Sequence, residues 1–239
     1  MGSMRTDDHR SGMTLEFVAG KGLTETGLKP QFPKGYSCTE IASNFGSPTR
    51  YDGSKRPSFR MAGLHGGLDL SLSEGTPLLA LASGFVIHKG TGGRAMGEYL
   101  WVHYPTESTG LKKHIYAKYQ HLREPSDLEV GAVVKAGQVI AHSVATGTYG
   151  QHFGDTGYPH LHMTVVASPS GEFRIKGPRV LPKGARLFDP TAVYLSPGQF
   201  EKVWHDPTAL SGTSVPVPAR KKTDSDSMGY RLVWPVMCD

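Results

Sequence analysis

The 239-residue sequence contains no run of 18 apolar residues, so none of it is predicted to cross a membrane as a helix. It also has no zinc-finger spacing and no RNA-recognition signature, and its basic residues are scattered apart from the short cluster at Arg220–Lys222. We therefore expect no nucleic-acid partner. The net charge of +5 is modest and favours some other anionic partner, such as an acidic polymer.

Cysteine is scarce, with only Cys38 and Cys238 near the two ends of the chain. Two cysteines fit one disulfide in an exported protein, and they fit two unrelated thiols equally well. Their separation in sequence does not choose, because a disulfide depends on the distance between the Cα atoms. The first residues, "MGSMRTDDHRSGM", lack the apolar segment of a signal peptide and are interpreted as a cloning remnant followed by native sequence.

A long helical period is also missing, whereas 30 glycines and 17 prolines indicate a turn-rich β protein. Between about 68 and 166, short β-rich runs alternate with turn signals, which predicts an antiparallel all-β domain. The best helix candidate is Pro197–Asp206, which begins with proline. We predict a flexible N-terminal arm over 1–30, a β domain over 31–196, and a helix, linker and tail over 197–239.

Two histidines stand one residue apart in the strand-like stretch "YPHLHMTV", which runs from Tyr158 to Val165. Because side chains alternate along a strand, His160 and His162 are expected to share one face. The side chains expected to turn toward the core are Leu161, Met163 and Val165. The stretch fits either two solvent-facing histidines or a metal ligand beside a catalytic imidazole, and it does not choose between them.

A second pair of potential ligands, His65 and Asp69, occurs in "GLHGGLDL". In a straight strand these side chains would lie roughly 13 Å apart, but Gly66 and Gly67 permit a bend that brings them together. With one strand histidine they supply three ligands, the number that catalytic zinc sites use while leaving a fourth position for water. The remaining strand histidine and His121 in "YQHL" would then be suited to proton transfer.

Six stretches occur in the order found in lysostaphin-type (LytM/LasA-like) zinc peptidoglycan endopeptidases, and the sequence resembles this family over roughly 32–195. Each stretch is a weak motif, whereas six in the correct order are a strong signal. The stretches are "SNFG" (43–46), "HGGLD" (65–69), "GTPLLALASGFV" (75–86), "YQHL" (119–122), "VGAVVKAGQVIA" (130–141) and "HLH" (160–162).

The resemblance implies an antiparallel two-sheet metallopeptidase domain with a groove, few short helices and flexible termini. It implies that His65, Asp69 and His162 bind a zinc ion (Zn²⁺) and that His121 and His160 are the catalytic residues. The implied function is zinc-dependent hydrolysis of peptide cross-links or stem peptides of bacterial peptidoglycan outside the cytoplasm, in the periplasm or as a secreted protein. We expect the protein to be a monomer.

Two alternatives stay open. The first is a non-catalytic module that binds wall peptides or activates an amidase, although the complete set of five site residues argues against it. The second is a peptidase that acts on proteins, such as Gly-rich proteins. The resemblance does not indicate which bond is cut, and the long loop with His152 and Asp155 is expected to border the groove. His103 is interpreted as a structural, hydrogen-bonded residue.

Overall fold

The structure is a computed structural model that describes residues 13–93, 96–148, 158–224, 229 and 231–239. Within these residues the strands form one eight-stranded sheet and four two-stranded sheets, most of them antiparallel, which confirms the predicted fold class. No helix among the described residues has the length and apolar character needed to span a membrane.

In the described parts of the chain the helices are few and short, as predicted. They are α1 (Leu15–Gly20), η1 (Met61–Gly63), α2 (Thr106–Thr109), η2 (Pro190–Tyr194) and α4 (Pro197–His205). The strands of the large sheet are β2 (Ile41–Ser43), β3 (Leu68–Ser71), β5 (Gly84–Thr91), β6 (Glu98–Tyr104), β7 (His114–Leu122), β8 (Val133–Val134), β10 (His160–Ser168) and β13 (Arg186–Phe188). The small sheets pair β1 (Lys29–Gln31) with β14 (Ser214–Pro216), β4 (Pro77–Leu79) with β9 (Val139–His142), β11 (Phe173–Lys176) with β12 (Arg179–Pro182), and β15 (Arg220–Lys221) with β16 (Met237–Cys238).

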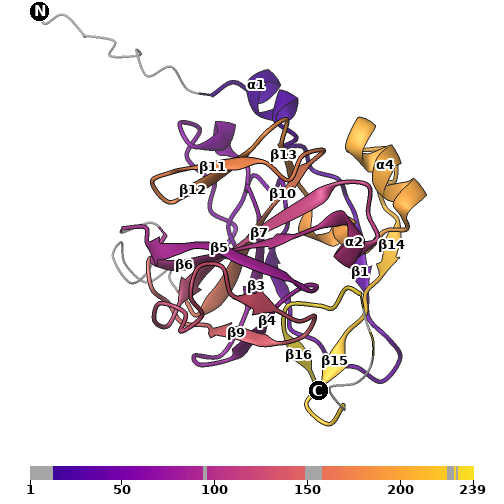
Figure 1. Cartoon of the computed structure of the whole chain (residues 1–239). Helices are drawn as coiled ribbons and strands as arrows, with labels where there is room; N and C mark the ends of the chain where they lie inside the picture. The colour runs from indigo at the N-terminus through magenta and orange to yellow at the C-terminus, as the bar shows by residue number, and fades with distance from the viewer. Residues whose placement is uncertain (1–12, 94–95, 149–157, 225–228, 230) are drawn as a thin grey trace, which may run out of the picture.

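Strand β10 lies inside the large sheet, where it pairs antiparallel with β3 on one side and with β7 on the other (Figure 1). Its residues Leu161, Met163 and Val165 are fully buried in the main hydrophobic core, as their alternation predicted. The other face of the sheet carries a second apolar cluster, which includes Trp101 of β6 and Val180 of β12. The β11–β12 hairpin therefore packs on the face opposite the main core.

The N-terminal segment differs from the flexible arm expected for 1–30. Residues 1–12 lie outside the described residues, but α1 follows directly, and the hydroxyl of Thr14 caps it by accepting from the backbone N–H of Phe17. Val18 and Leu23 are buried with Phe45, and β1 pairs in parallel with β14. Residues 13–30 are thus ordered through contacts with distant parts of the chain.

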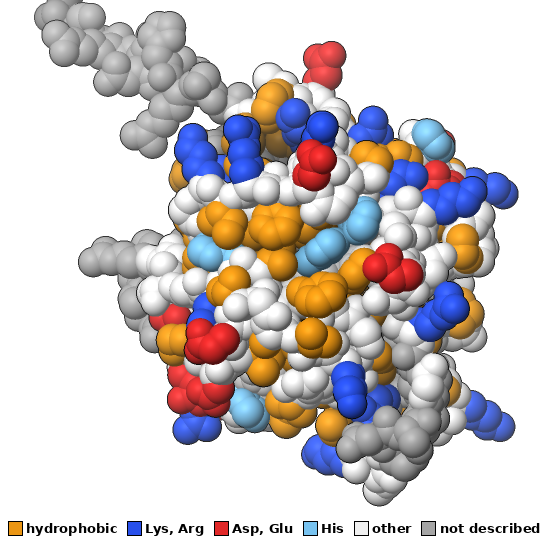
Figure 2. Space-filling model, viewed as in Figure 1, with side chains coloured by type: hydrophobic (Ala, Val, Ile, Leu, Met, Phe, Trp, Pro, Cys, Tyr) orange, Lys and Arg blue, Asp and Glu red, His pale blue; other side chains and the backbone are white. Residues whose placement is uncertain are grey.

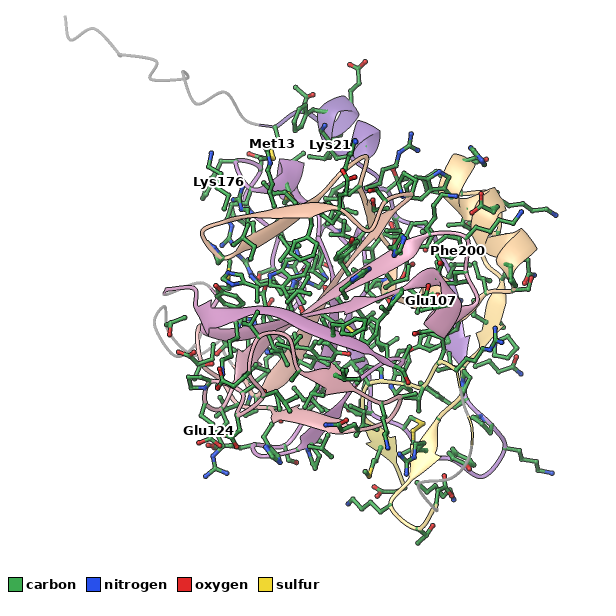
Figure 3. All side chains as sticks on the ribbon, in the orientation of Figure 1. Met13, Lys21, Glu107, Glu124, Lys176 and Phe200 are labelled. Atoms are coloured by element: carbon green, nitrogen blue, oxygen red, sulfur yellow. A yellow bond between two sulfur atoms is a disulfide. The ribbon has the colours of Figure 1, made fainter. Side chains whose placement is uncertain are left out.

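The C-terminal segment begins with the predicted helix, α4, whose Ser196 and Gln199 form a capping box. Phe200 is fully buried on the inner side of α4 (Figure 3), with its ring centroid 4.6 Å from that of Phe188. The expected tail is also ordered at its end, because Trp234 is fully buried in the main core. The end of this segment therefore packs on the β domain.

The two cysteines form a disulfide between Cys38 and Cys238, which settles the alternatives that the sequence left open (Figure 3). The bond joins residues 200 positions apart, next to backbone hydrogen bonds in both directions between Ser37 and Asp239. The disulfide thus fixes the C-terminal segment to the N-terminal part of the chain.

Lys and Arg side chains on the face drawn in Figure 2 are dispersed among acidic ones, in agreement with their scatter in the sequence.

Candidate active site

Strand β10 places both of its histidines on one face, at the floor of a groove. His162 lies directly opposite Asp69 of β3 and opposite Gln120 of β7. His160 lies two pairs further along, opposite Ser71. The expected shared face is therefore confirmed, and the residues that alternate with the histidines fill the core on the other side.

The two glycines between His65 and Asp69 form the expected bend, which leads from His65 into β3. Gly67 also allows a close approach, because a Cβ there would lie 2.6 Å from the carbonyl oxygen of Met163 and 2.8 Å from the ring of His162. No side chain fits at that distance. Glycine at this position therefore makes room for the His162 imidazole.

His65, Asp69 and His162 converge through three atoms. His162 Nδ1 lies 2.7 Å from Asp69 Oδ1, and His65 Nε2 lies 3.2 Å from the same oxygen. The two ring nitrogens are 3.1 Å apart. Donor atoms bound tetrahedrally to one zinc ion stand roughly 3.3 Å from each other, given metal–ligand lengths of about 2.0–2.1 Å. The spacing of the three atoms fits a common ion.

The hydrogen bonds on the far side of each ring indicate what lies between these atoms. His65 Nδ1 donates to the carbonyl oxygen of Asn44 at 3.0 Å, because a carbonyl only accepts. In a neutral His65, Nε2 then carries a lone pair, which faces the Asp69 carboxylate. His162 Nε2 lies 3.1 Å from the hydroxyl of Thr164, which can accept a hydrogen bond from Nε2–H, so that Nδ1 carries no proton. With these tautomers the three atoms present lone pairs to one another, an arrangement that a shared proton or a bound cation relieves.

Asp69 is ionised in this environment. Burial acts to raise its pKa, but the facing imidazoles of His65 and His162 outweigh burial and hold the pKa well below its ordinary value. Its second oxygen, Oδ2, lies 3.5 Å from Arg56 Nη2. Arg56 also donates to the Ser43 hydroxyl at 2.9 Å, so the guanidinium is fixed and orients Oδ1 toward the two histidines. Sequence reasoning did not find Arg56.

His121 reaches the groove through a β-bulge. The register between β6 and β7 shifts at this point, because Tyr99 lies opposite Gln120 and Glu98 lies opposite Leu122. His121 is therefore the extra residue of the bulge. Its φ of +64° lies in the left-handed region, which few residues other than glycine adopt. Plain alternation would turn His121 away from Gln120, whereas the bulge brings both side chains to the groove.

His121 and His160 are oriented alike by backbone carbonyls. His121 Nδ1 donates to Thr146 at 2.7 Å, and His160 Nδ1 donates to Tyr158 at 2.8 Å. Each ring therefore keeps Nε2 for other partners, and the ring centroids are 4.5 Å apart. Burial, followed by the neighbouring His160, holds the pKa of His121 well below its ordinary value, so this imidazole is neutral at neutral pH.

The groove has a volume of about 320 Å³ and contains all five of the predicted site residues. Tyr158 lines it beside His160, with ring centroids 4.7 Å apart, and Tyr51 from another loop contacts Tyr158 at 4.2 Å. The loop residues His152 and Asp155 lie outside the described residues. His103 is not in the groove: it bonds His114 at 3.0 Å and stacks on Tyr116, which agrees with a structural role.

Comparison with known proteins identifies this domain. The family model described as Peptidase family M23 matches residues 63–172, a range that holds the five site residues. Residues 63–172 form an M23 peptidase domain. Lysostaphin of Staphylococcus staphylolyticus is 33% identical over 103 residues, which are 42% of this chain and 18% of that protein. The chain thus spans about a fifth of the length of this relative.

Two solved structures are also similar to this chain. The catalytic domain of lysostaphin from Staphylococcus simulans has 23% identity and a TM-score of 0.39, with 66% of this chain and 86% of that chain covered. A zinc-containing peptidase from Vibrio cholerae has 25% identity and a TM-score of 0.43, with 70% and 39% covered. The M23 match confirms the lysostaphin-type resemblance of the sequence.

A buried lysine lies behind the groove wall of the M23 domain. Lys118 Nζ is 4.5 Å from the centre of the Tyr99 ring and 2.6 Å from Met96 Sδ, and Met96 lines the groove. Burial, with a smaller contribution from Arg179, lowers the pKa of Lys118 to about 7. Among the described residues no carboxylate offsets its charge.

Lys118→Met is therefore expected to stabilise the protein at pH 6 more than at pH 10. Below pH 7 Lys118 is protonated in the folded state, which then contains a buried charge. Between pH 7 and 10 Lys118 is neutral in the folded state but still protonated in the unfolded state. Wild-type stability thus gains up to about 1.4 kcal/mol per pH unit in that window, and the variant lacks this gain. Thermal unfolding at both pH values measures the effect. The exposed Lys176 (Figure 3) supplies the control, Lys176→Met, and an equal shift at both pH values for Lys118→Met would contradict the prediction.

Proposed function

We propose that this chain is a zinc-dependent endopeptidase that hydrolyses peptide bonds in bacterial peptidoglycan, either cross-links or stem peptides. The observation that carries the proposal is the convergence of His65 Nε2, Asp69 Oδ1 and His162 Nδ1 at the floor of a groove, next to two further imidazoles. Two imidazole nitrogens and one carboxylate oxygen are donors that zinc accepts, so these residues would hold it.

When bound, zinc supplies an acidic water and polarises the scissile carbonyl. The residues of the chain supply proton transfer and orientation. His121 and His160 each accept a proton at Nε2, because Nδ1 of each ring donates to a backbone carbonyl. One of the two takes the proton of the attacking water and then returns it to the leaving amine. The protonated ring also stabilises negative charge that develops on the carbonyl oxygen.

Surrounding residues hold the donors in place. The Asn44 carbonyl fixes the tautomer of His65, Arg56 fixes Asp69, and the Tyr158 ring supports His160. The disulfide between Cys38 and Cys238 supports a site of action outside the cytoplasm, where disulfides persist. We therefore propose that the enzyme works in the periplasm or after secretion.

Digestion of purified peptidoglycan from several envelope types tests the proposal. We expect release of muropeptides that stops when a chelator removes the metal and resumes when zinc is added back. Mass analysis of the fragments names the bond that is cut. If zinc is bound and no wall is digested, the protein is instead a module that binds wall peptides or activates an amidase. Cleavage of Gly-rich proteins but not of wall would indicate a peptidase for protein substrates.

A further inference from the structure

One wall of the groove is unusually basic. Residues 50–60 contain four basic side chains and one acidic one, which are Arg50, Lys55, Arg56, Arg60 and Asp52. Three of the four, the arginines, line the groove. The described lining residues include a single carboxylate, Asp69. Its Oδ1 faces His65 and His162 and its Oδ2 faces Arg56, so it is fully engaged within the site.

The three arginines differ in what they contact. Arg56 bonds Ser43 and pairs with Asp69, and is therefore part of the catalytic centre. Arg50 bonds the Ser54 hydroxyl and the backbone carbonyl of Lys55, and so supports its own loop. Arg60 is exposed at the groove, and within the described part of the chain no carboxylate pairs with its guanidinium. Arg60 is therefore a positively charged groove residue that the site itself does not engage.

The backbone holds Arg60 in a defined place. It precedes Met61 and Ala62, which adopt left-handed φ values of 48° and 53°, and its carbonyl accepts a hydrogen bond from Gly63 at 2.9 Å. Met61 packs with Leu187 against the buried cluster at α1. Non-glycine residues persist in this conformation only where surrounding contacts impose it, and such strain gathers at functional sites. Arg60 is thus presented to the groove from an anchored turn.

We propose that Arg60 determines specificity by binding a carboxylate of the peptide substrate. A guanidinium matches a carboxylate through two parallel hydrogen bonds, and a concave wall of one charge sign concentrates the opposite sign. The inference rests on the proposed function and refines it. Among wall peptides, the enzyme prefers stems and cross-links with a free carboxylate near the scissile bond, and it disfavours uncharged glycine bridges.

Two synthetic stem-peptide dimers test this inference, one with a free carboxylate on the diaminopimelate residue at the cross-link and one with that carboxylate converted to an amide. Wild-type enzyme is expected to cleave the free acid with a kcat/KM about 10- to 100-fold higher, which is the range for a charged hydrogen-bonded contact. Arg60→Gln should bring this ratio close to one, and Arg60→Lys should retain part of it. Lys55→Gln removes the same charge from the same loop, at a position that does not line the groove, and should leave the ratio unchanged.

Binding of the same two dimers to the His121→Asn protein, measured by calorimetry, separates this inference from the proposed function. Tighter binding of the free acid by His121→Asn, which disappears in His121→Asn/Arg60→Gln, supports the role of Arg60. This conclusion holds even if wild-type enzyme cleaves neither dimer, whereas such a lack of cleavage would count against the endopeptidase. Equal affinity and equal cleavage of the two dimers by protein with intact Arg60 would overturn it. A preference that survives Arg60→Gln would overturn it as well.

Discussion

Replacing His162 by alanine is expected to abolish both zinc binding and peptide hydrolysis. The substitution removes Nδ1, which lies 2.7 Å from Asp69 Oδ1 and 3.1 Å from His65 Nε2, and it leaves only two donors. Loss of a group that merely orients a ligand lowers metal affinity about 10- to 100-fold, so loss of the ligand itself should exceed 100-fold. Metal analysis after dialysis, together with peptidoglycan digestion, measures both effects.

Two further variants make this result specific. His142→Ala removes an exposed histidine at the end of β9 and should keep zinc and activity. Asp69→Asn keeps the size of the side chain but removes the negative charge that the two imidazoles face, and it should reproduce the loss of zinc. Circular dichroism shows whether each variant is folded. Stoichiometric zinc in folded His162→Ala would refute the assignment of this ligand.

The sequence was sufficient to predict the part of the site that depends on local spacing and motif order. Alternation along one strand put His160 and His162 on a common face, and the Gly-Gly pair allowed His65 to approach Asp69. All five predicted residues line one groove. Their roles as ligands and acid–base groups stay predictions that the variants test.

Other parts of the site depend on contacts that no local pattern reveals. Arg56 reaches Asp69 from an irregular loop, and the Asn44 carbonyl that orients His65 has no side-chain signature. Alternation alone places His121 on the wrong face, because a bulge depends on the pairing of two strands. The sequence offered this residue as a histidine of a neighbouring strand, and the motif order assigned it a catalytic role.

The structure of the two terminal segments also depends on contacts that no local sequence pattern reveals. The sequence predicts a flexible arm over 1–30 because its apolar residues, among them Val18, Leu23 and Leu28, follow neither a helical nor a strand period. These three residues are buried because residues far along the chain meet them: Leu187 packs against Val18 and Leu23, and Leu28 lies in the main core. The disulfide likewise depends on a Cα–Cα distance of 4.4 Å between residues 200 positions apart, which sequence separation cannot supply.

His121→Asn is expected to retain zinc and to lose hydrolysis by roughly 100- to 10,000-fold, the contribution typical of a general acid–base group. Asparagine is the sharper choice than alanine, because it tolerates the left-handed φ of +64° at the bulge. The ring centroid of His121 lies 6.0 Å from that of His162, and the converging donor set is complete without it. Zinc content and kcat therefore separate in this variant, whereas they fall together in His162→Ala.

His103→Asn is the matched control, since His103 is also a strand histidine whose ring lies beside a second histidine ring, yet it lies outside the groove. It should keep both zinc and activity. Full activity in His121→Asn would leave His160 as the only proton acceptor among the five site residues. Loss of zinc in His121→Asn would mean instead that the bulge supports the metal site, because the imidazole contributes no atom to the converging set. The pattern of zinc and activity across His162→Ala, His121→Asn and their histidine controls thus assigns a ligand and a proton-transfer group independently.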